Sequence, residues 1–460
     1  MTIESEQVSL PDFGMASEMP DLPVSVLSGR LQRTLMRMEQ RSIEVLLVYG
    51  DREHFANLEY LTGFDPRFEE ALLLLDRDGR RKLLVGNECM GYLPNEKLGL
   101  EVELFQAFSL MGQPRGRSRP LRRILADFRI RKGCRVGCVG WKYYNPPLVE
   151  GGELALDIPA YLVDLLRELT GAKDRVVNAT NLLMGVEDGL RIINGPEQIA
   201  RFEYAATVTS SAVLELMRHI KPGVREDELE HYLDGRGLPL TCHRMVSFGE
   251  KVRRGLASAS ANRACLGEPF TVAFGVNGAL NCRAGMVARG PEDLNGELRD
   301  FFPRFAANYL DVVRTWYEAL RVGAGAGDVY ATTEGKRDPE LYDFAVNPGH
   351  YLHLDEWVHS PFLADSTVEL RSGMALQADI IPVSKGPFCY INAEDGIILA
   401  DETLRGELRT RYPDMWRRIE RRQRFMAETL GIAVDVSVLP LSNMPGWAPP
   451  YALNHHNIPY

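Results

Sequence analysis

Residues 347–361 read Asn-Pro-Gly-His-Tyr-Leu-His-Leu-Asp-Glu-Trp-Val-His-Ser-Pro. Three of the nine histidines of the chain fall in this stretch, with two carboxylates and a tryptophan among them: His350, His353, His359, Asp355, Glu356 and Trp357. Histidine is the side chain that titrates near neutral pH without a perturbed environment. Grouping imidazoles and carboxylates in an apolar neighbourhood costs free energy unless the groups are used. The stretch therefore predicts proton transfer or metal ligation, with ordinary packed or surface histidines as the alternative.

Two apolar segments that follow this stretch each carry acids. Residues 373–382 read as a buried strand with one carboxylate, Asp379. Residues 390–399 read as a second strand, in which a polar interruption contains Glu394 and Asp395. A histidine, an acid on one strand and an acid on the next strand form a recurring arrangement for an inward-facing site. We therefore expect His350, Asp379 and Glu394 to lie together.

The same three segments carry a family resemblance. Gly349-His350, Gly373-Met374 with Asp379 and Pro382, and Glu394-Asp395-Gly396 are similar to the last three site segments of the creatinase, aminopeptidase P and prolidase family. Residues 191–199 and 220–226 are similar to the opening of its catalytic domain, and the likeness runs from about residue 30 to about residue 400. The resemblance implies an α/β (α+β) protein, with a creatinase-like N-terminal α/β domain followed by a C-terminal pita-bread domain.

The length of 460 residues agrees with two domains. We expect a flexible arm over 1–22, the creatinase-like N-terminal domain over 23–185, and the pita-bread catalytic domain over 186–430. In the first domain, apolar strands alternate with helical segments, which is typical of an α/β layer. Residues 431–460 show no family match, and we expect this tail to cover the pocket or a dimer partner.

Composition narrows the classes of partner and compartment. The net charge of −10 argues against a nucleic-acid or anionic-membrane surface as the main partner. No window of 18 apolar residues is present, so no membrane span is expected. Seven scattered cysteines predict reduced thiols rather than a disulfide framework. The first residues include acids and no apolar core, unlike a signal peptide, and the sequence therefore favours a cytoplasmic protein.

The chain departs from its family at the metal-binding positions. The metallopeptidases of the family hold two metal ions with bridging carboxylates, which offset the repulsion between dications. By position, the two family aspartates fall at Ala273 and about Ala284, and no acid occurs from 269 to 290. Arg283 adds a positive charge beside the second position. The sequence therefore predicts that no dinuclear site forms.

Three family ligand positions keep donor side chains, namely His350, Asp379 and Glu394. A single divalent ion, with iron as one candidate, remains an alternative on these three residues, because one histidine and two carboxylates form a facial triad. His353 would be a fourth ligand in that case. The preferred reading has no metal and no cofactor.

The first functional hypothesis is a metal-independent enzyme that cleaves a C–N bond, by hydrolysis or elimination, in a small cationic or zwitterionic nitrogen compound. Creatinase, which the chain resembles in lacking the aspartates, works in this way. Asp379 and Glu394 would hold the positive group, and His350, with His353 or His359, would act as general base and then acid. Asp355 or Glu356 would orient an imidazole. Both acids, together with Trp357 and Tyr390, would contact the substrate.

The alternatives are a mononuclear metal enzyme, such as an iron-dependent lyase or oxygenase, and a non-catalytic paralogue that binds a small molecule. Creatinase activity itself is in doubt, because the loop at 253–257, where creatinase carries its histidine, contains none. A peptidase ranks last, because the proline-directed peptidases depend on the missing metal ligands.

The resemblance also implies a homodimer. In creatinase-like dimers, the N-terminal domain reaches the partner's active site just after a glycine that corresponds to Gly63. Carried over by position, Asp65, Arg67 and Phe68 would face the pocket of the neighbouring subunit, where Arg67 and Phe68 would contact substrate. A solvated loop is the alternative.

Overall fold

The computed structural model describes residues 5–255, 257–454 and 457–459. The chain forms two compact units. One is Leu22–Arg191, and the other joins the segment that ends at Asp21 to Ile192 and the residues after it. The division falls after Arg191 rather than at the predicted 185/186, and the N-terminal segment groups with the second unit.

The first unit is built on a six-stranded sheet with the order β5-β4-β3-β2-β6-β7. Its strands are β2 (Val45–Gly50), β3 (Ala71–Asp76), β4 (Arg81–Val85), β5 (Glu101–Leu104), β6 (Val136–Val139) and β7 (Val176–Asn178). Strand β2 runs antiparallel to β3 and parallel to β6. All residues of β2 and β3 are buried, because both faces of the sheet centre are covered.

Helices cover the sheet of the first unit. Alternate β2 residues, Val45, Leu47 and Tyr49, join a core with apolar residues of α3 (Leu121–Asp127) and α4 (Ala160–Thr170). Helix α2 (Ala56–Thr62) packs on β2, and α1 (Val24–Gln40) packs on α2. A short helix, α5 (Asn181–Met184), ends this unit. The unit is therefore the expected α/β layer.

The second unit contains two four-stranded antiparallel sheets among its described residues. The first has the order β15-β10-β9-β8, with β8 (Met245–Phe248), β9 (Pro269–Val276), β10 (Ala279–Met286) and β15 (Asn392–Glu394). The second has the order β12-β13-β16-β17, with β12 (His350–Tyr351), β13 (Ala375–Gln377), β16 (Gly396–Leu399) and β17 (Val438–Pro440). Because β15 and β16 are separated by Asp395 alone, one short segment supplies a strand to each sheet.

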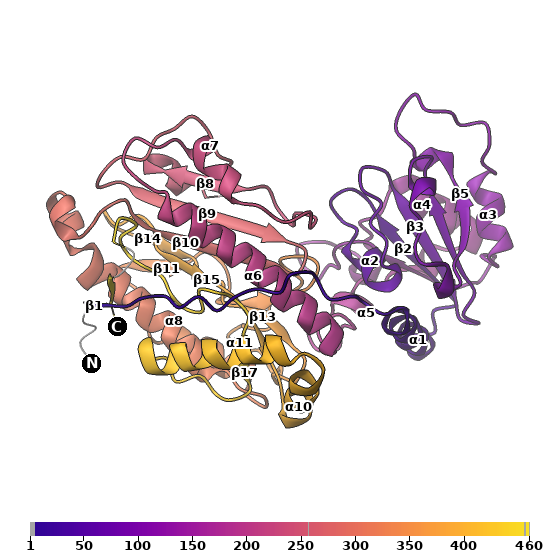
Figure 1. Ribbon diagram of the computed structural model, residues 1–460. Coiled ribbons are helices and arrows are strands. Elements are labelled where there is room, and N and C mark those ends of the chain that lie inside the picture. Colours follow the sequence, from indigo (N-terminus) through magenta and orange to yellow (C-terminus); the bar gives the residue numbers. More distant parts are fainter. Residues whose placement is uncertain (1–4, 256, 455–456, 460) are drawn as a thin grey trace. The chain divides into compact units, whose positions relative to one another are not determined.

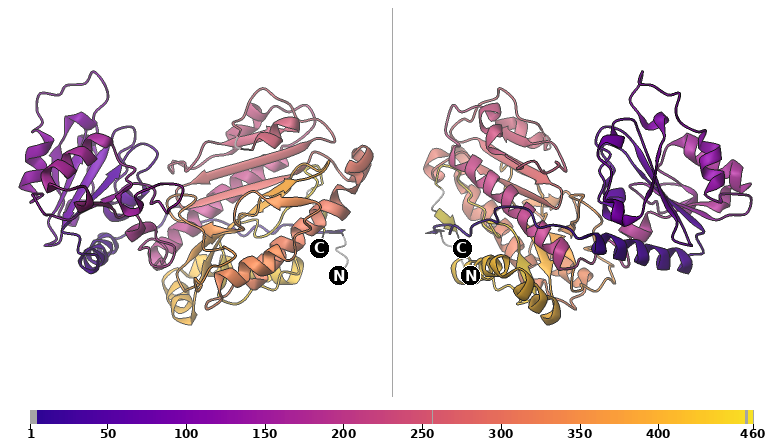
Figure 2. Two further views of the ribbon diagram at one scale, coloured as in Figure 1. Left: turned by 180° about the vertical axis from the view of Figure 1, so that it is seen from behind. Right: turned by 45° about the vertical axis from the view of Figure 1, so that its right-hand side comes forward.

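A long helix, α6 (Pro196–Arg218), lies along β9 and β10 (Figures 1 and 2). It begins as its sequence predicts, with Pro196 at the first position and Glu197 in the first turn. The remaining helices are α7 (Glu226–Leu229), α8 (Ala307–Ala319), α9 (Ala326–Glu334), α10 (Glu402–Arg411) and α11 (Pro413–Arg424). Two further strand pairs are β11 (Tyr342–Phe344) with β14 (Pro382–Ser384), and β1 (Ser5–Gln7) with β18 (Asn457–Pro459).

Two helical segments of this unit are irregular. The segment that leads into α8 forms 3₁₀ and π turns that include Pro303, and it becomes an α-helix only at Ala307. Helices α10 and α11 are separated between Tyr412 and Pro413, where Tyr412 leaves the helical region with φ −132° and ψ 61°. A proline disfavours the helical conformation of the residue before it, which explains the break.

The two chain ends also differ from expectation. Phe13, in the segment predicted as a flexible arm, is 3% exposed, and its ring centroid lies 5.7 Å from that of Phe425. Within the tail predicted to cover the pocket or a partner, residues 437–452 are all buried, and Val438–Pro440 is an edge strand. Phe13 and residues 437–452 are therefore part of the core of their own unit.

Candidate active site

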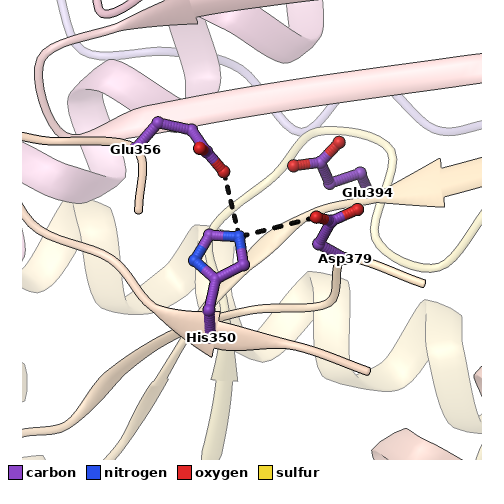
Figure 3. A group of neighbouring side chains, drawn as sticks. All are labelled: His350, Glu356, Asp379 and Glu394. Atoms are coloured by element: carbon purple, nitrogen blue, oxygen red, sulfur yellow. Dashed lines mark ion pairs between the residues drawn. The ribbon is translucent and has the colours of Figure 1, made fainter. Parts of the chain in front are cut away.

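Four acidic or imidazole side chains meet in the second unit (Figure 3). His350 lies on β12, and Asp379 lies two residues after β13. Glu394 ends β15, and Glu356 comes from the turn that follows His350. One ligand atom from each residue lies within 4.8 Å of the others. The structure therefore brings together the three residues of the sequence motif and adds Glu356.

His350 is held in place by a backbone that only glycine allows. Gly349 has φ +100°, and a Cβ there would lie 2.8 Å from the Trp316 ring and 2.9 Å from the Gln377 carbonyl oxygen. The Gly349 N–H donates to the Asp379 carbonyl oxygen at 2.9 Å, which ties the two site segments together. His350 pairs directly with Gln377 across β12 and β13. The Gly-His dipeptide of the motif thus fixes the direction of the imidazole.

The His350 ring presents its Nε2 atom to the acids. Nε2 lies 2.9 Å from Glu356 Oε1 and 3.8 Å from Asp379 Oδ2. Nδ1 lies 3.1 Å from the Tyr351 carbonyl oxygen, which only accepts, so Nδ1 carries a proton. The Trp357 ring stacks on the imidazole with a centroid distance of 4.1 Å and an angle of 24°. Nε2 is therefore the atom that gains or loses a proton in the site.

Burial perturbs the acid–base behaviour of the group. Desolvation raises the pKa of Asp379 to about 7, although the His350 charge opposes the shift. Desolvation, followed by the charges of Asp379 and Glu356, raises the pKa of Glu394 well above its usual range. Burial lowers the pKa of His350, but the carboxylates of Glu356 and Asp379 raise it by more, so the net shift is upward. The site thus holds more acid groups than one imidazolium can neutralise, and the raised pKa values of Asp379 and Glu394 favour their protonated forms.

Glu394 has a hydrogen-bond partner that the sequence analysis missed. The Gln377 side-chain amide donates to Glu394 Oε1 at 3.2 Å and to the Leu280 carbonyl oxygen at 2.6 Å. Gln377 is fully buried and faces His350 across the sheet. Its place on the strand, two residues before Asp379, is the signal that identifies it.

The positions of the two family aspartates lie on the same face of the first sheet as Glu394. Directly opposite residues across its four strands are Met245, Ala273, Cys282 and Glu394. Ala284 is two residues from Cys282 on β10 and therefore points to the same face. This face offers one carboxylate, and a dinuclear centre with bridging acids does not fit the residues present.

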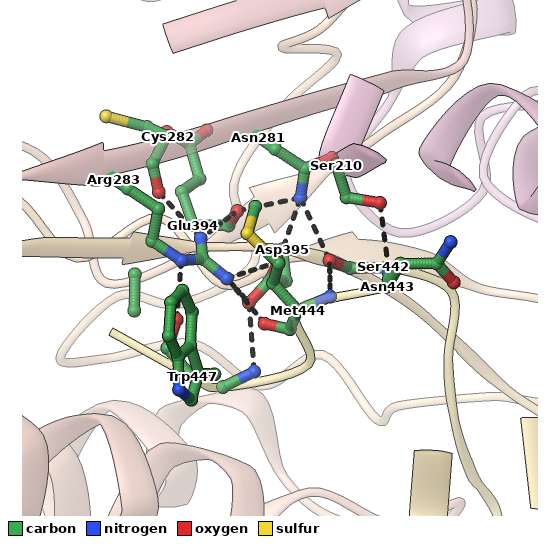
Figure 4. Close-up of polar contacts among 12 residues, drawn as sticks. Ser210, Asn281, Cys282, Arg283, Glu394, Asp395, Ser442, Asn443, Met444 and Trp447 are labelled. Atoms are coloured by element: carbon green, nitrogen blue, oxygen red, sulfur yellow. Dashed lines mark hydrogen bonds and ion pairs between the residues drawn. The ribbon is translucent and has the colours of Figure 1, made fainter. Parts of the chain in front are cut away.

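Arg283 points to the opposite face of the sheet, so its positive charge does not face the family position beside which the sequence places it. It forms a buried pair with Asp395 at 2.8 Å, and both side chains are 1% exposed (Figure 4). Arg283 also donates to the carbonyl oxygens of Met444 and Trp447, and the Gly446 N–H donates to Asp395 at 3.0 Å. The C-terminal segment thus completes the neutralisation of Asp395.

The same network holds the backbone of Glu394. Arg283 Nη1 and Asn281 Nδ2 each donate to the Glu394 carbonyl oxygen at 3.1 Å. Asn281 also donates to Asp395 at 2.8 Å and lies 3.3 Å from the Ser442 hydroxyl (Figure 4). The tail therefore acts on the site through the strand that carries Glu394.

Other residues of the sequence prediction lie outside the group of four. His353 is fully buried, its Nδ1 accepts the Leu354 N–H at 2.8 Å, and its ring packs edge-on against Phe202. The pKa of His359 is lowered by burial, and its Nδ1 lies 3.1 Å from the Ser360 carbonyl oxygen. Neither imidazole enters the group in Figure 3. Their predicted catalytic roles have no support from this placement.

Four predicted substrate-binding residues have different surroundings. The Asp355 carbonyl oxygen accepts the His353 N–H at 3.1 Å, within the turn that presents Glu356. The Tyr390 hydroxyl lies 3.4 Å from Asn392 Nδ2, and burial raises the pKa of the Tyr390 phenol well above its usual range. In the first unit, Arg67 has φ +57° and pairs with Asp65 at 3.3 Å, while Phe68 is 52% exposed.

Comparison with known proteins supports the resemblance. Residues 30–129 match the Creatinase/Prolidase N-terminal domain family. The prolidase from Pyrococcus horikoshii is 16% identical, with 81% of this chain and 95% of that chain covered and a TM-score of 0.60. A dipeptidase from Mycobacterium ulcerans is 15% identical, with 93% and 98% covered and a TM-score of 0.62. An X-Pro aminopeptidase from Thermotoga maritima is 14% identical, with 81% and 95% covered and a TM-score of 0.59.

These likenesses confirm the predicted fold class. The chain has a creatinase-like N-terminal domain and a C-terminal domain with the pita-bread fold of prolidases and aminopeptidase P. At these identities, the solved structures establish the fold and not the activity. No curated protein sequence matches the chain. Among the described residues, no helix is long and apolar enough to cross a membrane.

Proposed function

We propose that the protein cleaves a C–N bond in a small compound whose positively charged nitrogen binds among Glu356, Asp379 and Glu394. The observation that carries the proposal is the surplus of acid groups over cationic side chains in the site. Three carboxylates surround one imidazole, and the ion pairs that the described residues make with them come from His350 alone. A bound cation stabilises the ionised carboxylates. Without a cation, protonation of the acids removes their negative charge.

His350 is the proton carrier in this proposal. The neighbouring carboxylates raise the pKa of His350, which favours the protonated form in the free site, and the charge of a bound cation shifts Nε2 toward the neutral form. Neutral Nε2 takes the proton of a water molecule in hydrolysis, or of the substrate carbon in elimination. It then gives that proton to the nitrogen that leaves. Such transfer contributes typically about 10²–10⁴-fold in rate.

The test is an assay for released amine or ammonia over small amino, guanidino and quaternary-amine compounds. The native protein releases product from at least one of them, and His350→Gln loses about 10²–10⁴-fold in turnover while it keeps its fold. The matched control is His353→Gln, a neighbouring histidine outside the group. A folded His350→Gln protein with full turnover contradicts the assignment.

A single divalent ion is the second candidate, because the four ligand atoms within 4.8 Å of one another also suit one metal. His350, Glu356, Asp379 and Glu394 would hold it, and one nitrogen with three oxygens is a donor set that iron, zinc or manganese accepts. The ion would supply Lewis-acid polarisation to a bound water or carbonyl. Elemental analysis of protein purified without chelator separates the candidates, and stoichiometric metal that Glu394→Gln abolishes favours the second.

The homodimer prediction stands as a further part of the proposal. The loop with Arg67 and Phe68 presents an exposed apolar side chain, which supports a role at an interface. In the proposed dimer, this loop contacts the substrate bound by the other subunit. Light scattering gives the mass in solution, and Phe68→Ala raises KM more than it lowers kcat. A monomer with full activity contradicts this arrangement.

A further inference from the structure

One wall of the candidate site is apolar. Met245, Ala273, Leu280 and Cys282 form one hydrophobic cluster, against which Cys242 packs, and we call these five residues the apolar wall. Cys282 lies directly opposite Glu394 across β10 and β15, so the wall begins beside that carboxylate. Burial is the main cause that raises the pKa of the Cys282 thiol, and the negative charge of Glu394 is the second. The second cause agrees with this proximity.

The wall retains contact with solvent, unlike the other face of the same strands. Met245 and Ala273 are each 7% exposed, and Cys282 and Glu394 are each 5% exposed. The residues next to them on the strands, Val272 and Arg283, are exposed by only 1% and 0%. This residual exposure places the acids and the wall at one solvent-accessible spot, which we call the recess, with carboxyl groups on one side and apolar side chains on the other.

We propose that this recess selects an N-alkylated ammonium group that keeps at least one N–H. The N–H donates to the carboxylates of Asp379 and Glu394, and the alkyl substituents pack against the apolar wall. The inference rests on the proposed function, since it names the class of cation that the site accepts. Its basis is the position of two small side chains, Cys282 and Ala273, which lie directly across the strands from Glu394 and retain some solvent exposure.

Both halves of the recess contribute to this selection. A bare ammonium ion satisfies the acids but leaves the apolar wall facing water, which forgoes the free energy of burying apolar surface. A quaternary ammonium covers the wall but has no N–H, so the buried acids keep unmet hydrogen-bond capacity. Secondary and tertiary ammonium groups satisfy both sides.

The test is a titration series with the chlorides of ammonium, methylammonium, dimethylammonium, trimethylammonium and tetramethylammonium. Isothermal titration at fixed ionic strength, with chelator-treated protein, gives each Kd. Affinity rises by up to about fourfold for each buried methyl group as far as trimethylammonium and falls at tetramethylammonium. Equal affinities along the series, or tightest binding of ammonium or tetramethylammonium, overturn the inference and leave cation binding intact.

Variants separate this inference from the proposed function. Glu394→Gln weakens every member of the series, because it removes a charge that all of them need. Cys282→Ser, which is close to isosteric, reduces the ratio of trimethylammonium to ammonium affinity, and an unchanged ratio contradicts the role of the wall. Met245→Ala is a second test of the same ratio, with Met36→Ala, an exposed methionine of the first unit, as its matched control. Absence of binding for all members contradicts the proposed function itself.

Discussion

Glu394 and Asp395 are adjacent acids with opposite environments. Both are buried, at 5% and 1% exposure. Asp395 receives hydrogen bonds from Arg283, Asn281 and the Gly446 N–H. Glu394 receives one side-chain hydrogen bond among the described residues, from Gln377, and no ion pair. The difference teaches that a carboxylate neutralised inside the protein serves the fold, whereas an equally buried one without a countercharge indicates a ligand.

The largest expected effect is on stability at Asp395. Asp395→Asn leaves Arg283 buried without a countercharge, which lowers the free energy of unfolding by about 3–5 kcal/mol. Urea denaturation measures the loss. The double variant Arg283→Met with Asp395→Asn recovers most of it, because no lone charge remains. A single variant as stable as the native protein would erase the distinction between the two acids.

The corresponding isosteric substitution at Glu394 is expected to change stability little and ligand affinity strongly. Glu394→Gln replaces a buried acid that no cationic side chain of the described residues neutralises, so the free energy of unfolding stays within about 1 kcal/mol of the native value or rises. Affinity for the cation falls about 10–100-fold, because a charged hydrogen-bond partner is lost. On one preparation, titration calorimetry gives the affinity for the cation and urea denaturation gives the free energy of unfolding. Loss of stability together with retained binding would refute the prediction.

The pH dependence of stability sharpens the contrast. The pKa of Asp379 rises from 3.8 to about 7 on folding, so the native state binds more protons than the unfolded state between these values. Stability without ligand therefore falls as pH increases through this window. Denaturation from pH 4 to 8 should show a steeper fall for the native protein than for Asp379→Asn. A saturating cation reduces the difference between them.

The smallest effect is expected at His359, which lies outside the group. His359→Gln changes turnover by no more than about twofold, since it removes neither an acid nor the proton carrier. Steady-state kinetics of His359→Gln, run in parallel with those of His350→Gln, measure the change in turnover. A loss comparable to that of His350→Gln would return His359 to the catalytic set.

The sequence predicts the fold and the centre of the site because both depend on local patterns. Strand alternation and the segments around His350, Asp379 and Glu394 are contiguous, and the structure brings these three residues together. The orientation of Arg283 was accessible from strand parity, since residues 282 and 284 share a face and 283 does not. Gln377 was accessible in the same way.

The remaining features depend on tertiary contacts that one sequence does not encode locally. The pairing of Cys282 with Glu394 needs the order of strands in the sheet. The burial of Phe13 and of residues 437–452 joins segments from opposite ends of the chain to the core of one unit. No periodic pattern marks such segments, because their partners are remote in sequence.

The place of Gly446 beside Asp395 has a consequence for biosynthesis. Residues 444–447 are synthesised only after Arg283 and Asp395 are already part of the growing chain. Until then, the Arg283–Asp395 pair lacks three of its backbone partners, from Met444, Gly446 and Trp447. A chain that terminates before these residues would keep the incompletely hydrogen-bonded pair. Proteases that degrade defective nascent proteins would therefore distinguish it from the full chain.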